Sequence, residues 1–327
     1  MESPETQEES KVPSMIPEFP TVISSSSRTQ FSKCPQLFYL ETILGLRLKG
    51  GNVHLDAGHA YARALEVFRE YYYASEPEIE CPDRRLLEGQ ALGLEALITD
   101  YGHQDPPEHQ YNKSFDRVVK AFIEYFIKYP PATDRMQPAR GADNKPMVEF
   151  SFVFDIPGVY HPVTGDPLLY SGRADMVCEY NNAIWVYDDK TTGQMGATWR
   201  NQWELRSQFT GYIYGAIQHG MSPAGAIVRG MCLLKRDFKT EEVIVTRTPS
   251  QIERWLERLV WDAERMVQCW KDGYWPHVGE ESSACVEYSG CAMKTLCTSA
   301  NPAAYVPVYY QEYRWDPVEG KQSTFTK

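Results

Sequence analysis

Apolar residues along this chain recur with two different periods. A spacing of three to four residues predicts helices over 53–73, 84–101, 115–129, 202–219 and 250–270. Short β-type runs predict strands over 147–156, 169–179, 183–190, 226–234 and 242–248. Asn181-Asn182 separates the two central strands and is typical of a tight two-residue hairpin turn, because both residues tolerate positive φ. The pattern therefore predicts an α/β fold with a hairpin near the middle of the chain.

The hairpin turn fixes which residues face each other. A two-residue loop pairs Tyr180 with Ala183, and counting outward places Asp175 opposite Asp188 and Arg173 opposite Lys190. These four side chains share one face, and that of Asp189 lies on the other.

Two carboxylates opposed at this distance repel each other unless a cation lies between them. Mg²⁺ takes oxygen ligands and is often held by one or two carboxylates. Lys190 points to the same place, where an ammonium group can stabilise an oxyanion or orient a water. The register thus indicates a metal-dependent phosphodiester-cleaving site. An isolated Asp…Asp-x-Lys pattern is also consistent with a surface hairpin of solvated charges.

The two ends of the chain carry a second candidate site. Residues 1–20 are rich in Glu, Ser and Pro, which predicts a mobile tail. Ser27 or a neighbour can cap a helix over 28–33, and Pro35 can begin a second helical turn, with Cys34 between them. Near the other end, three of the eight cysteines (285, 291 and 297) recur at regular spacing, which in an intracellular protein indicates metal binding. After Ala304 we expect a loosely held tail.

Composition limits the class of protein. The 327 residues contain no apolar run as long as a transmembrane helix and no secretory signal peptide, so we expect a soluble intracellular protein with no membrane partner. The formal net charge of −11 argues against non-specific coating of nucleic acid, although a local basic groove can coexist with an acidic exterior. No phosphate-binding GxxxxGK[ST] loop is present, which argues against a motor or kinase.

Several ordered motifs carry a family resemblance: SSSRTQFSKCPQLFYL, a helical His59, a strand with Glu149, GRADMV, VYDDKTTG, QFTGY and the C-terminal cysteines. In this order they resemble the RecB-like branch of the PD-(D/E)XK nuclease superfamily, in particular CRISPR-associated RecB-like nucleases and the nuclease domain of AddB. The resemblance covers roughly Ser24 to Cys297.

The resemblance implies a restriction-endonuclease-like α/β core, with a central mixed β-sheet flanked by helices, an N-terminal helical insertion and a C-terminal iron–sulfur segment. We therefore expect one nuclease domain over 21–304, with a helical part at 53–130, a catalytic sheet core at 147–272 and cluster-binding ends at 28–40 and 274–300. Tails at 1–20 and 305–327 flank it.

The resemblance also assigns roles to residues. It implies that His59, Asp175, Asp188 and the backbone carbonyl of Asp189 bind Mg²⁺ or Mn²⁺. Lys190 matches the catalytic lysine, and Glu149 matches an outer-sphere or second-metal ligand. Gln208 and Tyr212 match a QxxxY motif that supports the site and contacts the nucleic acid.

In this branch Cys34, Cys285, Cys291 and Cys297 bind a [4Fe–4S] cluster. The spacing here is C-x5-C-x5-C, whereas C-x2-C-x5-C is usual, and four thiolates also suit zinc. The remaining cysteines (81, 178, 232 and 269) fall outside the pattern.

The expected activity is that of a metal-dependent DNA exonuclease acting on single strands or DNA ends inside a bacterial or phage-infected cell, leaving 5′-phosphates. A helicase or recombination protein is a candidate partner, since no helicase segment is present. Two alternatives stay open: a catalytically silent DNA-binding or scaffold protein of the same fold, and a zinc-stabilised nuclease with the same active site.

Overall fold

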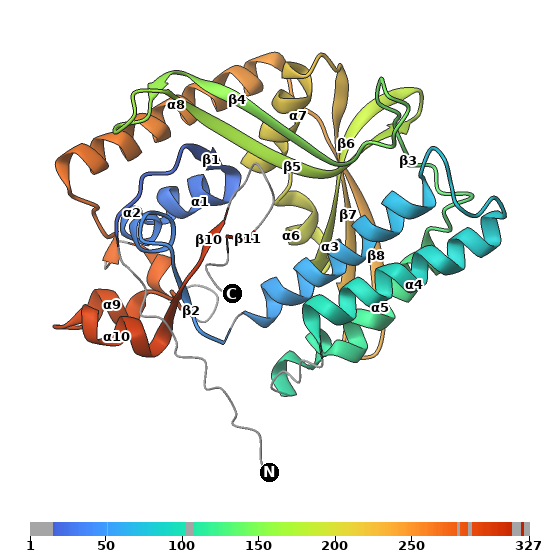
Figure 1. Ribbon diagram of the computed structural model, residues 1–327, viewed down its shortest axis with the longest axis horizontal. Coiled ribbons are helices and arrows are strands. Elements are labelled where there is room, and N and C mark those ends of the chain that lie inside the picture. Colours follow the sequence, from blue (N-terminus) through green and yellow to red (C-terminus); the bar gives the residue numbers. More distant parts are fainter. Residues whose placement is uncertain are drawn as a thin grey trace, which may run out of the picture. The chain divides into compact units, whose positions relative to one another are not determined.

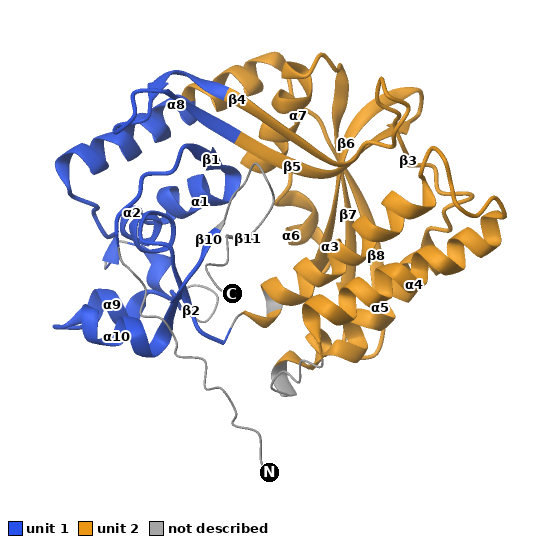
Figure 2. Cartoon of the chain, in the orientation of Figure 1, with its two compact units in different colours: residues 1–50, 155–170, 258–327 blue, residues 51–154, 171–257 orange. Residues whose placement is uncertain are grey.

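The computed structural model describes residues 16–50, 52–102, 108–279, 282–286, 290–315 and 322–323. The chain forms two compact units (Figure 2). Unit 1 comprises Met1–Gly50, Asp155–Tyr170 and Arg258–Lys327, and unit 2 comprises Gly51–Phe154 and Ser171–Glu257. The single domain predicted over 21–304 contributes residues to both units.

A mixed sheet forms the centre of the fold (Figure 1). Its strand order is β1-β5-β6-β7-β8, with β3 and β4 also pairing with β5. β6 and β7 are parallel, whereas β5–β6 and β7–β8 are antiparallel. The predicted α/β class with a central mixed sheet is therefore confirmed. The strands are β1 (Val22–Ser24), β3 (Gln137–Pro138), β4 (Val148–Tyr160), β5 (Pro167–Tyr180), β6 (Ala183–Thr192), β7 (Pro223–Leu233) and β8 (Phe238–Val245).

The hairpin between β5 and β6 forms as predicted. Asn181 and Asn182 have φ of 50° and 58°, the left-handed values that a primed two-residue turn requires. The register runs from Tyr180–Ala183 to Met176–Tyr187. Regular pairing ends there, so Asp175 lies one residue past the last regular pair.

Helices cover both faces of the sheet in unit 2. Helices α3 (Val53–Tyr72), α4 (Pro82–Tyr101) and α5 (Phe115–Lys128) share a core with Met231 and Leu233 of β7. The short helix η2 (Glu108–Lys113) precedes α5. The opposite face of the sheet packs against α7 (Ser207–Gln218), whose Tyr212 hydroxyl is hydrogen-bonded to Asp188 of β6. The helix predicted over 202–219 corresponds to α7, which begins five residues later, and a separate short helix, α6 (Ala197–Asn201), precedes it.

Close packing of α3, α4 and α5 depends on Gly93. A Cβ there would lie 2.7 Å from the carbonyl oxygen of Ala64 and 2.6 Å from the ring of Phe122. We expect Gly93→Ala to lower the free energy of unfolding by about 1–3 kcal/mol, because the backbone of α3 cannot move aside as a side chain can. Chemical denaturation measures this. Gly89→Ala, where only aromatic rings lie within 3.1–3.3 Å, is the milder control, and an equal loss in both variants would contradict the explanation.

Unit 1 is built from both ends of the chain. α1 (Ser25–Lys33) is capped by Ser24 and not by Ser27. Ser27 is the third residue of the helix, and its side chain accepts a hydrogen bond from the backbone N–H of Ser24, which completes a capping box. The other elements are α2 (Pro35–Phe38), η1 (Tyr39–Ile43), β2 (Leu46–Leu48), the C-terminal part of α8 (Pro249–Asp272), η4 (Ser283–Cys285), α9 (Lys294–Thr298), α10 (Pro302–Tyr309), β9 (Tyr310–Glu312), β10 (Arg314–Trp315) and β11 (Gln322–Ser323).

The predicted loose tails are partly wrong. β9 pairs with β2, and Val306 and Tyr310 are fully buried against Leu40, Leu44 and Leu46, so 305–312 belongs to a packed core. Phe19 is also buried, between His161 and Trp270. The remainder of the predicted N-terminal tail, 1–15, lies outside the described residues. None of the helices in the described part of the chain is long and apolar enough to cross a membrane.

Candidate active site

The two predicted carboxylates meet where β5 separates from β6. Oδ2 of Asp175 accepts a hydrogen bond of 2.7 Å from the backbone N–H of Asp189, so the Asp175 side chain reaches the level of residues 188–189. Asp188 is 1 % exposed. The pKa of Asp175 is raised to about 7, mainly by burial and in addition by the neighbouring carboxylate of Asp188. Burial also raises the pKa of Asp188. Both shifts reflect negative charge held in a place with too little water or counter-charge.

Lys190 lies beside this pair. Its ammonium group forms an ion pair with Oδ2 of Asp188. Burial lowers the pKa of Lys190, but the carboxylates of Asp188 and Asp175 outweigh this effect and raise it above the usual lysine value. The side chain is therefore a fixed positive charge at neutral pH.

The QxxxY residues reach the same carboxylate from α7. Gln208 donates a hydrogen bond of 2.7 Å from Nε2 to the hydroxyl of Tyr212, and that hydroxyl is hydrogen-bonded to Asp188. One turn of helix separates the two residues, which places both on the face of α7 toward the sheet. This chain of contacts restrains the side chain of Asp188 from the side opposite α3.

Asp189 points to the other face of β6, as the strand alternation predicts. Its carboxylate forms a buried ion pair with Arg69 of α3 and accepts a hydrogen bond of 2.8 Å from the hydroxyl of Tyr187. Only the backbone of Asp189 takes part in the site, through its N–H to Asp175.

Glu149 lies at the start of β4 in an unusual backbone conformation, with φ of 51°. Its carboxylate forms an ion pair of 2.8 Å with Nε of Arg173 on β5. The pKa of Glu149 is raised to about 9, mainly by burial and in addition by the carboxylates of Asp175 and Glu66. A non-glycine residue at positive φ is strained, and such strain is often retained at functional sites.

The structure does not bring His59 into this cluster. Its side chain is 64 % exposed and lies 4.0 Å from the carboxylate of Asp100 on α4. His59 and Glu66 share one face of α3, but seven residues separate them, which is about 10 Å along a helix. The α3 side chains whose charges act on Glu149 are those of Glu66 and Arg69.

Sequence reasoning placed Arg173 on the face of the site without giving it a role, and it missed three charged residues of this cluster: Arg63, Glu66 and Glu70. The three on α3 follow His59 at intervals of four, three and four, and so form one polar stripe opposite the apolar one. Arg63 forms an ion pair with Glu66, and both Arg63 and Arg173 interact with Glu70. The stripe could have been read from the sequence, although its neighbours on the sheet could not.

The described cluster has a deficit of positive charge. It contains five carboxylates (Glu66, Glu70, Glu149, Asp175 and Asp188) and three basic groups (Arg63, Arg173 and Lys190). This surplus of carboxyl groups contributes to the raised pKa values of Glu149 and Asp175, and oxygen donors gathered in this way suit a hard divalent cation. Within the described residues, however, no three His, Cys, Asp or Glu side chains already converge as a metal-binding group. The basic groups form ion pairs with the carboxylates instead.

The four predicted cluster cysteines lie together in unit 1. Cys34 is buried between α1 and α2, and the backbone N–H of Cys291 donates to the carbonyl of Cys285 at 3.2 Å. Burial raises the pKa of Cys297, and the thiols of Cys291, Cys34 and Cys285 raise it further. The four thiols are close enough to interact electrostatically, but among the described residues they are not arranged as a metal-binding group.

The chain matches one protein family and is similar to several solved structures. The family described as "PD-(D/E)XK nuclease superfamily" matches residues 22–298. Among solved structures, the chain is similar to a protein described as "Putative exonuclease" from Eubacterium rectale, with 12 % identity, a TM-score of 0.47 and coverage of 86 % of this chain and 94 % of that one. It is also similar to SSO0001, with 11 % identity, a TM-score of 0.29 and coverage of 75 % and 77 %. No curated protein matches the sequence significantly.

Proposed function

The chain belongs to the PD-(D/E)XK nuclease superfamily, and from this premise we propose that it is a metal-dependent DNA exonuclease acting on single strands or DNA ends. The observation that carries the proposal is the meeting of Asp175, Asp188 and Lys190 where β5 and β6 separate. Holding the buried carboxylate of Asp188 next to the half-buried one of Asp175 costs free energy, so a role in chemistry accounts for the pair better than a role in stability does.

Asp175, Asp188 and the backbone carbonyl of Asp189 are the groups that would hold Mg²⁺ or Mn²⁺. When bound, such an ion lowers the pKa of a water and offsets charge on the scissile phosphate. Glu149 lies next to Asp175 and would act as an outer-sphere ligand. His59, the further ligand that the family resemblance implies, would have to turn away from Asp100, 4.0 Å from its ring, to join these ligands.

Lys190 would orient the attacking water and stabilise negative charge on the phosphate. Its raised pKa keeps the ammonium group protonated at neutral pH, so it can donate hydrogen bonds but cannot accept a proton. Gln208 and Tyr212 would fix the orientation of Asp188 through their hydrogen bonds.

Digestion of end-labelled single-stranded DNA, with and without Mn²⁺, tests the activity. We expect shortening of the strand only with the metal, to products that carry 5′-phosphates. A protein that binds the DNA but leaves it intact with both Mg²⁺ and Mn²⁺ would instead be the silent DNA-binding protein.

For the four cysteines of unit 1 we propose a [4Fe–4S] cluster that links the two ends of the chain. Support comes from the mutual interactions of the thiols and from the packing of Cys291 with the core formed by Leu40, Leu44 and Leu296. An ultraviolet–visible spectrum of freshly purified protein tests this. Thiolate-to-iron absorption supports the cluster, whereas colourless protein that contains zinc supports the alternative.

We expect Cys34→Ala to lower the thermal midpoint more than Lys190→Ala does, because a bound cluster closes a very long loop of chain. The loss should resemble that of a native disulfide, about 2–5 kcal/mol. Thermal unfolding followed by circular dichroism measures it. Cys81→Ala is the matched control, since Cys81 is exposed and lies outside the cluster. Equal midpoints for Cys34→Ala and Cys81→Ala would contradict the prediction.

A further inference from the structure

We propose that Arg63 and Arg173 form a phosphate-binding pair that holds the DNA backbone beside the scissile bond. The inference rests on the proposed nuclease function and names the part of the site that recognises the strand. It also addresses how a chain of net charge −11 can bind a polyanion.

In the three ion pairs of the cluster, the basic side chain is more exposed than its acidic partner. The side chains of the three basic residues are 41 % (Arg63), 35 % (Arg173) and 30 % (Lys190) exposed. Their carboxylate partners are only 14 % (Glu66), 16 % (Glu149) and 2 % (Asp188) exposed. In each of these three ion pairs the cation is therefore more accessible to a ligand from solvent than its carboxylate partner, although Glu70 of the same cluster is also exposed.

Two other arginines near the site, Arg69 and Arg229, are not available in this way. The side chains of Arg69 and Arg229 are 4 % and 2 % exposed and are enclosed by Asp189, Asp134 and tyrosines. Arg63 and Arg173, by contrast, lie on different elements and converge on Glu70, so they belong to one surface.

The guanidinium groups have donors to spare. A guanidinium group has five N–H donors. In the described structure Arg173 forms its ion pair through Nε, and Arg63 forms its ion pair through Nη1. The remaining N–H groups can bind a phosphate in the bidentate geometry that arginine favours. Two such groups beside Asp175 suit two successive phosphates of one strand better than a single small anion.

The salt dependence of DNA binding tests this pair. Fluorescence anisotropy of labelled oligothymidylate is measured over a series of NaCl concentrations, with EDTA present so that no hydrolysis occurs. Each phosphate contact to a single strand contributes a slope of about 0.7 in a plot of log affinity against log salt. We expect Arg63→Gln and Arg173→Gln each to reduce the slope by about that amount.

Lys120→Gln is the control, because Lys120 forms an exposed ion pair with Asp116 on α5 and its loss changes the net charge equally. Its slope should equal that of the wild type. Arg173→Lys keeps the positive charge and the ion-pair partner of Glu149, so it should keep the wild-type slope. Its affinity should fall only because lysine cannot form the bidentate contact of a guanidinium group. This variant separates phosphate binding from a purely structural role.

The outcomes separate the two proposals. Wild-type slopes in both Arg→Gln variants, or no binding by the wild type, would overturn the phosphate pair even if the enzyme digests DNA. Reduced slopes in a protein that never digests DNA would support the pair and refute the nuclease.

Discussion

Replacing Lys190 with alanine is expected to lower the rate of DNA hydrolysis by about 10²–10⁴-fold, the usual contribution of a positioned proton-handling or charge-stabilising group. Lys190 is the one described basic side chain paired with Asp188, so its loss removes the positive charge next to the scissile phosphate. The rate is measured under single-turnover conditions with Mg²⁺ on end-labelled single-stranded DNA.

Asp188→Ala is expected to give an equally large loss, since it removes both a proposed metal ligand and the partner of Lys190. Circular dichroism checks that each variant folds. Lys120→Ala, on the exposed face of α5, should keep wild-type activity. If either site variant digests DNA at the wild-type rate, residues 188–190 are not the catalytic residues.

The geometry of the hairpin was predictable because it is local. Asn181-Asn182 sets the turn, and period-2 alternation then places every side chain of β5 and β6 on one face or the other. The separation of Asp189 from Asp188 and Lys190 follows from this alternation and holds in the structure.

The α3 part of the cluster was not predictable in the same way. Which turn of α3 lies over Glu149 depends on how the helix crosses the sheet, and a helix residue two turns away is already about 10 Å off. In the structure His59 lies 4.0 Å from Asp100, whereas the charge of Glu66, two turns farther along α3, acts on Glu149. The role of His59 as a metal ligand stays a prediction. The tails were misjudged for a related reason, since the burial of Phe19, Val306 and Tyr310 comes from contacts between distant segments.

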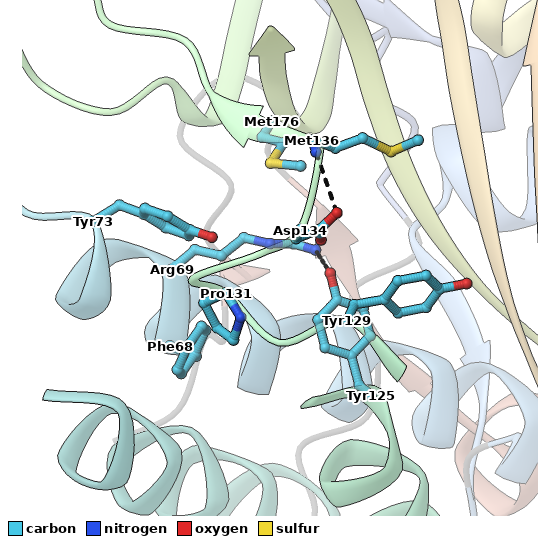
Figure 3. Close-up of a pocket in the computed structure, with 9 residues that line it drawn as sticks. All are labelled: Phe68, Arg69, Tyr73, Tyr125, Tyr129, Pro131, Asp134, Met136 and Met176. Carbon is cyan, nitrogen blue, oxygen red and sulfur yellow. Dashed lines mark hydrogen bonds between the residues drawn. The ribbon is translucent and has the colours of Figure 1, made fainter. Parts of the chain in front are cut away.

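A polar network lies buried behind β6, the strand that carries Asp188 and Lys190, and the fold depends on its charges remaining paired. Figure 3 shows Arg69 near Tyr73, Tyr125 and Asp134 in a small pocket on this side of β6. Arg69 donates to the hydroxyl of Tyr125 at 2.9 Å and forms an ion pair with Asp189. Burial alone would lower the pKa of Arg69, yet Asp189 and the tyrosines raise it, so the guanidinium group remains charged.

We therefore expect Arg69→Met to lower the free energy of unfolding by about 3–5 kcal/mol, because it leaves the carboxylate of Asp189 buried without a counter-charge. The side chains of Arg69 and Asp189 are 4 % and 3 % exposed, so water cannot replace the lost partner. Chemical denaturation measures the loss. Lys120→Met breaks an ion pair whose members are both 55 % exposed, and it should cost less than about 1 kcal/mol.

A double-mutant cycle identifies the cause of that loss. Adding Asp189→Asn to Arg69→Met removes the unpaired charge, so the double variant should recover much of the lost stability, and the two single effects should not add. Additive losses would mean that Arg69 stabilises the fold through packing alone. Since the backbone N–H of Asp189 holds Asp175, a recovered double variant should also regain binding of Mn²⁺, measured by calorimetry, relative to Arg69→Met. The buried pair behind β6 would then be what fixes the strand on which Asp188 and Lys190 are presented.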